Sequence, residues 1–486
     1  MEITVFHSRV NREIETLTER LHPPRVCIDN NSCKDCTVLK VDSANKYGIL
    51  LEMVQVLTDL DLIISKSYIS SDGGWFMDVF HVTDQAGNKV TDNNLMQKIE
   101  KELCATKAKE DIDDETELES CEELESNYTK LNVSTENTAL EMSGMDRPGL
   151  LSEISAVLVE MGCNVTSATA WTHNRRAACI IYVEEESKPG PIKDPKRLAH
   201  VKEELETVVQ ARGVNGDRNN VRLRNFATGH THTERRLHQL MYADRDYEGC
   251  RPCHGYSSGE HRRGCDGTHV SISRCKDRGY WVVNVICKDR PKLLFDTVCV
   301  LRDMHYVVFH AAISSKRSIA NQEYFIRHKM NNLALQTEIE REKLVLCIIA
   351  AIERRVSHGL RVDICTQNRM GLLSKVTHVI QQNGLSIPRV EIVTRGESVV
   401  GTFYVTNPLN QEVNPNIVEL LRQECGGSVT IVNDHKCPCG LSRSSSSSSI
   451  TSENNGSVEV KRKFSIGNML WSHIGKFSSN FSPIKY

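Results

Sequence analysis

The sequence predicts an α+β protein made of four tandem modules, each with the ferredoxin-like order βαββαβ and an antiparallel sheet. A β-like run, a polar turn, an amphipathic helix and two further β-like runs recur four times. A second helical stretch follows in each copy, and this order places both helices on one face of the sheet. The length of 486 residues and the 39% of hydrophobic residues suffice for several cores.

The polar turn is the most regular part of the repeat. The four copies begin at Cys36, Thr138, Tyr280 and Leu360. Their turns are Asn45 to Gly48, Asp146 to Gly149, Asp289 to Lys292, and Asn368 to Gly371. Apolar residues at helical spacing follow each turn, as from Leu150 to Met161, and predict a helix with one face toward a sheet.

The remaining elements follow from periodicity. Alternating stretches from Trp75 and from Ala177 predict strands after the first helix. The second helices are expected at Asn94 to Leu103, Pro195 to Gln210, Ala334 to Arg355, and Asn416 to Glu424. Closing strands are expected at Asn220 to Phe226 and Ser428 to Val432. The third copy has none after its long helix, and His269 to Arg274 upstream is the candidate substitute.

These elements divide the chain into eight segments. An N-terminal segment (1–34) precedes the first module (35–106), an acidic linker (107–136) and the second module (137–226). A helix with a Cys/His-rich linker (227–267) precedes the third (268–356) and fourth (357–434) modules, and a serine-rich tail (435–486) is expected to be disordered. The segment 227–267 is expected to divide the array into two pairs.

Composition restricts the partners and the compartment. The net charge of -3 gives no long-range attraction for nucleic acid or anionic membrane. No apolar run is long enough to span a bilayer, and the N-terminus lacks the pattern of a signal peptide. We therefore expect no nucleic-acid or membrane partner, a cytoplasmic or nuclear location, and cysteines that are buried rather than disulfide-bonded.

The turn of the second copy carries a family resemblance. The stretch DRPGLL, Asp146 to Leu151, resembles the turn that opens the first helix of ACT domains, and the segment from Lys40 to Leu62 strengthens the likeness. Four copies without a catalytic domain resemble the plant ACT-domain-repeat (ACR) proteins, relatives of the sensor end of bacterial uridylyltransferases. The resemblance implies a regulatory protein that binds an amino acid at domain interfaces and pairs with itself or a partner through its sheets or helices.

The turn chemistry suits a small zwitterion. A helix N-terminus presents N–H groups and partial positive charge to a carboxylate, a glycine allows close approach, and Asp or Asn can bind an ammonium or carboxylate. The candidate ligand residues are Asn45, Gly48, Asp146, Gly149, Leu150, Asn368, Gly371 and Leu372. Because these are also ordinary turn formers and caps, a purely structural role is the alternative. Copies two and four are the favoured sites, and Lys292 disfavours copy three.

Other chemistry is weaker. No common catalytic motif occurs, so we expect no enzyme and no cofactor. Cys250, Cys253, His261 and Cys265 have zinc-ligand spacing, but an unliganded loop is favoured, and Cys33 with Cys36 is too sparse for a metal site. RNA binding or pure scaffolding by the same fold stays the rival function, although the third strands lack the RNA-binding signature. Ser465 after a basic cluster is a candidate phosphorylation site.

Overall fold

The computed structural model describes residues 25–432 except for several internal gaps. These gaps are 73, 106–136, 187–189, 211–220, 225–231, 252–266, 276–278, 317, 332, 356–358, 408–412 and 415. The predicted acidic linker, the serine-rich tail and Ser465 therefore lie outside the described residues, as do parts of the middle linker.

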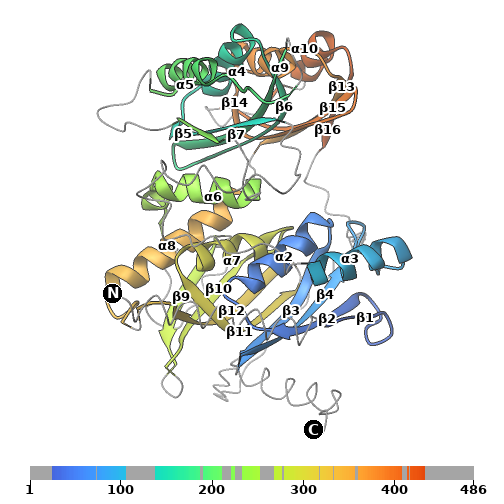
Figure 1. Cartoon of the computed structure of the whole chain (residues 1–486), viewed down its shortest axis with the longest axis vertical. Helices are drawn as coiled ribbons and strands as arrows, with labels where there is room; N and C mark the ends of the chain where they lie inside the picture. Colours follow the sequence, from blue (N-terminus) through green and yellow to red (C-terminus); the bar gives the residue numbers. More distant parts are fainter. Residues whose placement is uncertain are drawn as a thin grey trace, which may run out of the picture. The chain divides into compact units, whose positions relative to one another are not determined.

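The strands form two eight-stranded antiparallel sheets, each shared by two modules. The first sheet has the order β1-β2-β4-β3-β11-β12-β10-β9. It combines the first and third modules; the four modules are called domains 1 to 4 from here on. Its strands are β1 (Arg25–Asp29), β2 (Thr37–Ala44), β3 (Ile63–Asp72), β4 (Trp75–Thr83), β9 (His269–Arg274), β10 (Trp281–Lys288), β11 (Tyr306–Lys316) and β12 (Ile319–His328). Four helices cover one face (Figure 1): α2 (Ile49–Asp59), α3 (Asn93–Ala105), α7 (Leu293–Asp303) and α8 (Glu338–Arg354).

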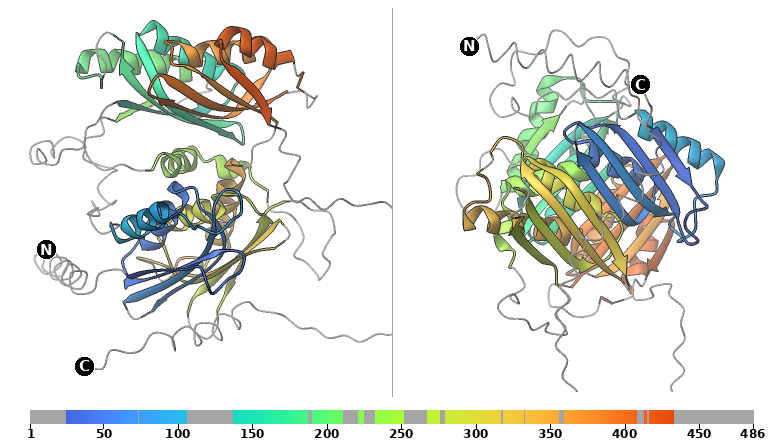
Figure 2. Two further views of the ribbon diagram at one scale, coloured as in Figure 1. Left: turned by 90° about the vertical axis from the view of Figure 1, so that its right-hand side faces the viewer. Right: turned by 90° about the horizontal axis from the view of Figure 1, so that it is seen from below.

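The second sheet has the order β16-β13-β15-β14-β6-β7-β5-β8 and combines domains 2 and 4. Its strands are β5 (Thr138–Met145), β6 (Cys163–His173), β7 (Arg176–Glu185), β8 (Val221–Arg224), β13 (Leu360–Gln367), β14 (Ser386–Arg395), β15 (Ser398–Thr406) and β16 (Ser428–Val432). Its helices are α4 (Leu150–Glu160), α5 (Pro195–Gln210), α9 (Leu372–Gln382) and α10 (Asn416–Cys425). Figure 2 shows in side view that each sheet carries its helices on a single face.

The pairing of modules corrects the expectation from the sequence. The middle segment was expected to separate two pairs of sequence neighbours, but β3 pairs with β11 and β6 pairs with β14, so domain 1 joins domain 3 and domain 2 joins domain 4. The first helices of the joined domains also contact each other, α2 with α7 and α4 with α9. The segments 107–136 and 227–267 separate the first three modules, whereas α8 ends at Arg354 and β13 begins at Leu360, and the length of a linker adds little entropic cost.

The edge strands follow two rules. Domains 2 and 4 close with C-terminal strands, as predicted, at β8 and β16. Domains 1 and 3 take their edge strand from upstream: β9 pairs with β10, which confirms the predicted substitute, and β1 pairs with β2. The predicted start of the first module at residue 35 therefore leaves out one strand of its sheet.

Two hydrophobic cores result, one for each sheet and its helices. Leu50, Met53, Val54 and Leu57 of α2 share one core with Phe295 and Leu301 of α7. Leu150, Ile154 and Leu158 of α4 share the other with Val376 and Ile380 of α9. Joining the modules buries the helix pair as well as the sheet, so each joined pair is expected to unfold as one unit. No helix among the described residues is both long and apolar enough to cross a bilayer.

The buried apolar residues of the middle-segment helix, α6 (Thr233–Ala243), form a separate small cluster. Its apolar residues Leu237, Leu240 and Met241 pack against Trp171, Ala178 and Ile180. Those three side chains come from β6 and β7, on the face that α4 does not cover, because neighbouring residues of a strand point to opposite faces. The helix α6 also contacts α7.

One buried carboxyl in domain 1 predicts a pH effect. Asp78 of β4 is 1% exposed and accepts a hydrogen bond from the Ser70 N–H at 3.4 Å. Burial raises its pKa to about 8, although the hydrogen bond opposes the rise. Because the folded pKa lies above the unfolded value of about 3.9, its contribution to stability is complete below pH ~4. It is lost at up to roughly 1.4 kcal/mol per pH unit as pH rises toward 8.

The test is the Asp78→Asn variant, which cannot ionise at this position. The free energy of unfolding of this variant, measured in urea at each pH, should increase relative to that of the parent protein as pH rises from 5 to 8. An identical pH dependence of the two proteins would show that Asp78 does not titrate in this range.

Candidate functional site

The four turns that open the first helices have the same backbone geometry. The residue before each helix is left-handed, with φ of 94° at Gly48, 84° at Gly149, 63° at Lys292 and 74° at Gly371. Lys292 thus adopts a left-handed conformation that glycine adopts more easily than other residues. No side chain caps any of these four helices. Each turn therefore offers a helix N-terminus to whatever lies opposite.

Opposite the three glycine turns lies the partner domain, and the facing residue follows a simple rule. A Cβ added to Gly149 would lie 2.2 Å from Gln381 Nε2, one added to Gly48 would lie 2.9 Å from Arg302 Nε, and one added to Gly371 would lie 3.3 Å from Val159. In each case the facing residue is the tenth after the turn residue of the partner domain. At these three turns the contacts within the joined pairs therefore follow an internal two-fold symmetry, and the turns differ in the residue that this position carries.

The turn of domain 2 opens into a cavity of about 140 Å³ between domains 2 and 4. Its lining includes Asp146 to Ser152, Trp171 and Thr172 of β6, Gln381 of α9, and Ser386 to Pro388 of β14. An engineered apolar cavity of about 150 Å³ in another protein holds benzene, so this volume suits a small metabolite. The three predicted ligand residues of this copy, Asp146, Gly149 and Leu150, line it.

Polar groups of both signs surround this cavity. Asp146 as a whole is exposed at the rim, but neighbouring atoms partly desolvate its carboxyl. This desolvation raises the pKa of Asp146, although the Arg147 N–H and the Arg147 charge lower it. The Arg147 guanidinium pairs with Glu153 and donates to the Val208 carbonyl at 3.0 Å. Among the described atoms, Arg147 Nε is buried without a hydrogen-bond partner. The cavity therefore presents groups that can bind an ammonium and a carboxylate.

The turn of domain 4 has far less space. Asn368, Gly371 and Leu372, the predicted residues of this copy, line a cavity of about 20 Å³ against Val159 and Ser155. That volume holds about one water molecule. Ser155 Oγ lies 3.0 Å from Thr377 Oγ1 beneath the two turns and ties α4 to α9. In this structure the fourth turn is closed by an aliphatic contact.

The turn of domain 1 is filled by cations of domain 3. The Arg302 guanidinium lies 3.6 Å from the centre of the Tyr47 ring, the Lys329 ammonium lies 4.3 Å from it, and the Tyr47 hydroxyl donates to the Arg302 carbonyl at 3.1 Å. Asn45 donates from its side chain to Ser71 Oγ at 2.5 Å, so this amide serves the turn itself. The approach to Gly48 is therefore occupied by Arg302.

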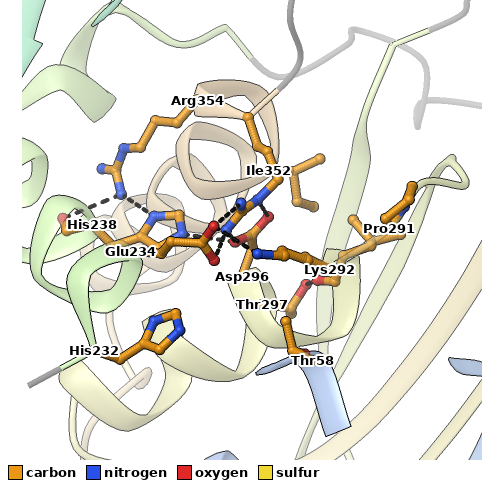
Figure 3. A network of polar contacts seen from close by, with 12 residues as sticks. Thr58, His232, Glu234, His238, Pro291, Lys292, Asp296, Thr297, Ile352 and Arg354 are labelled. Carbon is orange, nitrogen blue, oxygen red and sulfur yellow. Dashed lines mark hydrogen bonds and ion pairs between the residues drawn. The ribbon is translucent and has the colours of Figure 1, made fainter. Parts of the chain in front are cut away.

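The turn of domain 3 is filled by α6. Lys292 Nζ lies 2.8 Å from Glu234 Oε1 (Figure 3). Arg355 binds the same carboxylate, with Nη1–Oε1 at 2.9 Å and Nη2–Oε2 at 3.1 Å. Burial would raise the pKa of Glu234, but Arg355 and Lys292 outweigh it and lower the pKa to about 2. Glu234 is thus a carboxylate of the chain itself, held at the turn that opens α7.

Around Glu234 lies a buried ionic network that sequence reasoning missed. Arg355 also binds Asp296, with Nε–Oδ2 at 2.8 Å and Nη2–Oδ1 at 2.6 Å, and Asp296 is completely buried. Burial would raise the pKa of Asp296, yet Arg355 and Arg290 hold it well below its usual range. His238 Nε2 of α6 donates to the same carboxylate at 2.9 Å. Burial lowers the pKa of His238, against the charge of Asp296.

The network continues to domain 2. Arg354 binds Asp246 with Nε–Oδ2 at 2.7 Å, and Asp246 Oδ2 lies 2.8 Å from His173 Nδ1. Burial would lower the pKa of His173, but contacts with Asp246, Cys250 and Glu353 raise it to about 10. Arg236 of α6 binds Glu141 of β5 at 2.9 to 3.0 Å. Arginines are seldom buried, so no sequence pattern identified Arg236, Arg354 and Arg355 as interior residues.

The cysteine and histidine candidates of the middle linker are only partly described. Cys250 is buried and its sulfur accepts from Asn174 Nδ2 at 3.2 Å. Cys253, His261 and Cys265 lie outside the described residues. His232 packs edge-on against Phe295 and lies 2.9 Å from Asp59 Oδ1.

Comparisons with known proteins agree with this architecture. A family model described as the ACR family N-terminal ACT domain matches residues 32–110, and an ACT domain model matches residues 138–209. The chain is 50% identical over 492 residues to ACT domain-containing protein ACR1 of Arabidopsis thaliana, with 100% of both chains covered. It is 46% identical over 435 residues to ACR3 of the same plant, covering 89% of this chain and 92% of the relative.

A shorter match reaches a bacterial protein. Over 81 residues the chain is 42% identical to a bifunctional uridylyltransferase/uridylyl-removing enzyme of Azospirillum brasilense, which covers 17% of this chain and 9% of that enzyme. The full-length matches, the two family models and the four modules agree. The chain belongs to the plant ACR family of ACT-domain-repeat proteins.

Proposed function

We propose that this protein is a regulatory sensor that binds a free amino acid in the cavity beside Gly149, between domains 2 and 4. The observation that carries the proposal is the cavity of about 140 Å³ at an uncapped helix N-terminus. The N-terminus of α4 suits the ligand carboxylate, and the Asp146 carboxyl at the rim suits its ammonium. Gln381 lies within reach of either group from the other domain.

The other three turns explain why one site is favoured. Arg302 fills the approach to Gly48, Glu234 and Arg355 fill the approach to Lys292, and Val159 lies against Gly371. An amino acid would have to displace buried ion pairs or apolar contacts at these positions, and each displacement costs free energy. The expected stoichiometry is therefore one amino acid per chain.

A route for regulation leads from this cavity to α6. Trp171 lines the cavity through β6, and its ring packs on His238 at 5.0 Å and beneath the Arg355 guanidinium at 5.0 Å. A ligand that shifts β6 or β14 would therefore change the contacts that hold α6. In this proposal the partner surface is the one that α6 covers or exposes, and the ligand acts by favouring one arrangement of α6.

The experiment is a thermal-shift screen of the full-length protein against the twenty amino acids. At a ligand concentration of 100 Kd, one site stabilises the folded state by about 2.7 kcal/mol, which raises the melting temperature measurably. We expect a small group of chemically related amino acids to do so, with one equivalent bound in calorimetry. If none of the twenty raises the melting temperature at millimolar concentration, the proposed function is wrong.

A further inference from the structure

A Cys-x-x-Cys segment and a histidine meet at the start of β2. Cys33 Sγ and Cys36 Sγ are 3.1 Å apart, and Cys36 Sγ lies 3.4 Å from His81 Nδ1. The three atoms all lie within 4.8 Å of one another. The two cysteines alone are too sparse to predict a metal site, and the fold adds a histidine 45 residues after Cys36.

The sheet explains why these residues converge. The register of β2 and β4 pairs Val38 with His81, and Cys36 lies two residues before Val38 on the same side of the strand. Diagonal neighbours of this kind are within reach of each other's side chains. Cys33 is brought back by the β1–β2 loop, in which the Asp29 carboxylate accepts the N–H groups of Asn31 and Ser32 at 2.9 and 3.0 Å.

We propose that Cys33, Cys36 and His81 bind a thiophilic divalent metal ion, with zinc as the expected ion. A tetrahedral zinc with Zn–S of about 2.3 Å and Zn–N of about 2.0 Å needs S···S and S···N separations of roughly 3.8 and 3.5 Å. The observed separations of 3.1 and 3.4 Å reach these values when the sulfurs move apart by less than about 1 Å. One coordination position remains for water or another ligand.

Charge and burial support a metal at this place. Two thiolates and a neutral imidazole balance the charge of Zn²⁺, so the ion adds no uncompensated charge at a half-buried site. Cys36 is buried, and Cys33 and His81 are partly buried, so the ligands are already positioned. A metal here would fasten the β1–β2 loop to β4 and stabilise the edge of domain 1 that carries the upstream strand.

The alternative product of the same two cysteines is a disulfide. It would require the sulfurs to approach from 3.1 Å to about 2.05 Å. Zinc instead uses the His81 nitrogen, which a disulfide leaves without a role. The two outcomes are therefore separable by whether His81 matters.

The test uses the full-length protein after reduction and removal of bound metal with a chelator. This protein is titrated with Co²⁺ in the absence of oxygen, and its affinity for Zn²⁺ is then measured in competition with a chromophoric chelator. We expect one Co²⁺ with a thiolate-to-cobalt charge-transfer band and tetrahedral visible bands. The variant Cys33→Ser/Cys36→Ser should lose this band, and His81→Ala should bind at least about 100-fold more weakly, because changes outside the ligand shell alone cost 10–100-fold.

Two control variants make the result specific. Cys27→Ser/Cys365→Ser removes two exposed cysteines and should keep the band. Cys253→Ser/Cys265→Ser removes cysteines of the other candidate cluster and should keep it too. The proposal is overturned if the band survives in Cys33→Ser/Cys36→Ser, if it disappears only in Cys253→Ser/Cys265→Ser, or if a Cys33–Cys36 disulfide forms in the presence of zinc.

Discussion

Replacing Arg355 with methionine should lower the free energy of unfolding by about 3–5 kcal/mol, the cost of removing one partner from a buried ion pair. The Arg355 side chain is 4% exposed and binds two carboxylates, Glu234 and Asp296, that are themselves 11% and 0% exposed. Methionine keeps most of the packing volume but leaves two buried negative charges with fewer partners. The loss exceeds anything expected from a surface position.

The measurement is urea unfolding at pH 7, followed by tryptophan fluorescence, because Trp171 lies beside Arg355. Arg422→Met is the matched control: Arg422 pairs with Glu419 on the surface, with side chains 50% and 57% exposed, and should cost less than about 1 kcal/mol. A loss below about 1 kcal/mol for Arg355→Met would mean that the network does not stabilise the fold.

The same variant has a pH signature. In the parent protein the pKa of Glu234 is lowered to about 2, so its stabilising contribution is complete above the unfolded value of about 4.3 and is lost as pH falls toward 2. Without Arg355, burial dominates and the carboxyl accepts a proton at higher pH. The stability difference between the two proteins should therefore shrink as pH falls from 7 to 4, and a constant difference would contradict this assignment.

Gly149→Lys should abolish the rise in melting temperature that an amino acid produces, a loss of about 2.7 kcal/mol of ligand stabilisation at 100 Kd. The φ of 84° at Gly149 is strained for any other residue, and a Cβ there would lie 2.2 Å from the Gln381 side chain. Lys292 shows that the same turn accepts lysine in this fold. The variant should therefore fold, with its side chain in the cavity.

Gly371→Lys is the matched control. It carries the same strain, at φ of 74°, but its Cβ would meet Val159 at 3.3 Å and leave the larger cavity open. It should keep the ligand-induced shift. Calorimetry on both variants checks the result: binding that survives in Gly149→Lys but is lost in Gly371→Lys would move the site to the turn of domain 4.

Short-range patterns in the sequence determined the elements of the four modules. The Asp or Asn that begins each turn, the apolar face from Leu150 onward and the alternation of the strands specify turn, helix and sheet, because these features depend on neighbours within about a dozen residues. The helix Pro195–Gln210 and the strand Ser428–Val432 were predicted with the bounds that they have in the structure. The sequence also shows Lys292 where the other three turns have glycine, and this substitution distinguishes the third turn from the others.

Tertiary structure alone decided which turn is open. The joining of β6 to β14 put Gln381 opposite Gly149, and the joining of β3 to β11 put Arg302 opposite Gly48. It also brought Glu234 to Lys292 and His81 to Cys36. Turn and helix patterns report contacts between near neighbours, whereas each of these meetings joins residues far apart in the chain. The Gly149–Gln381 and Gly48–Arg302 meetings depend on which modules share a sheet, and no periodicity of the single sequence encodes that choice.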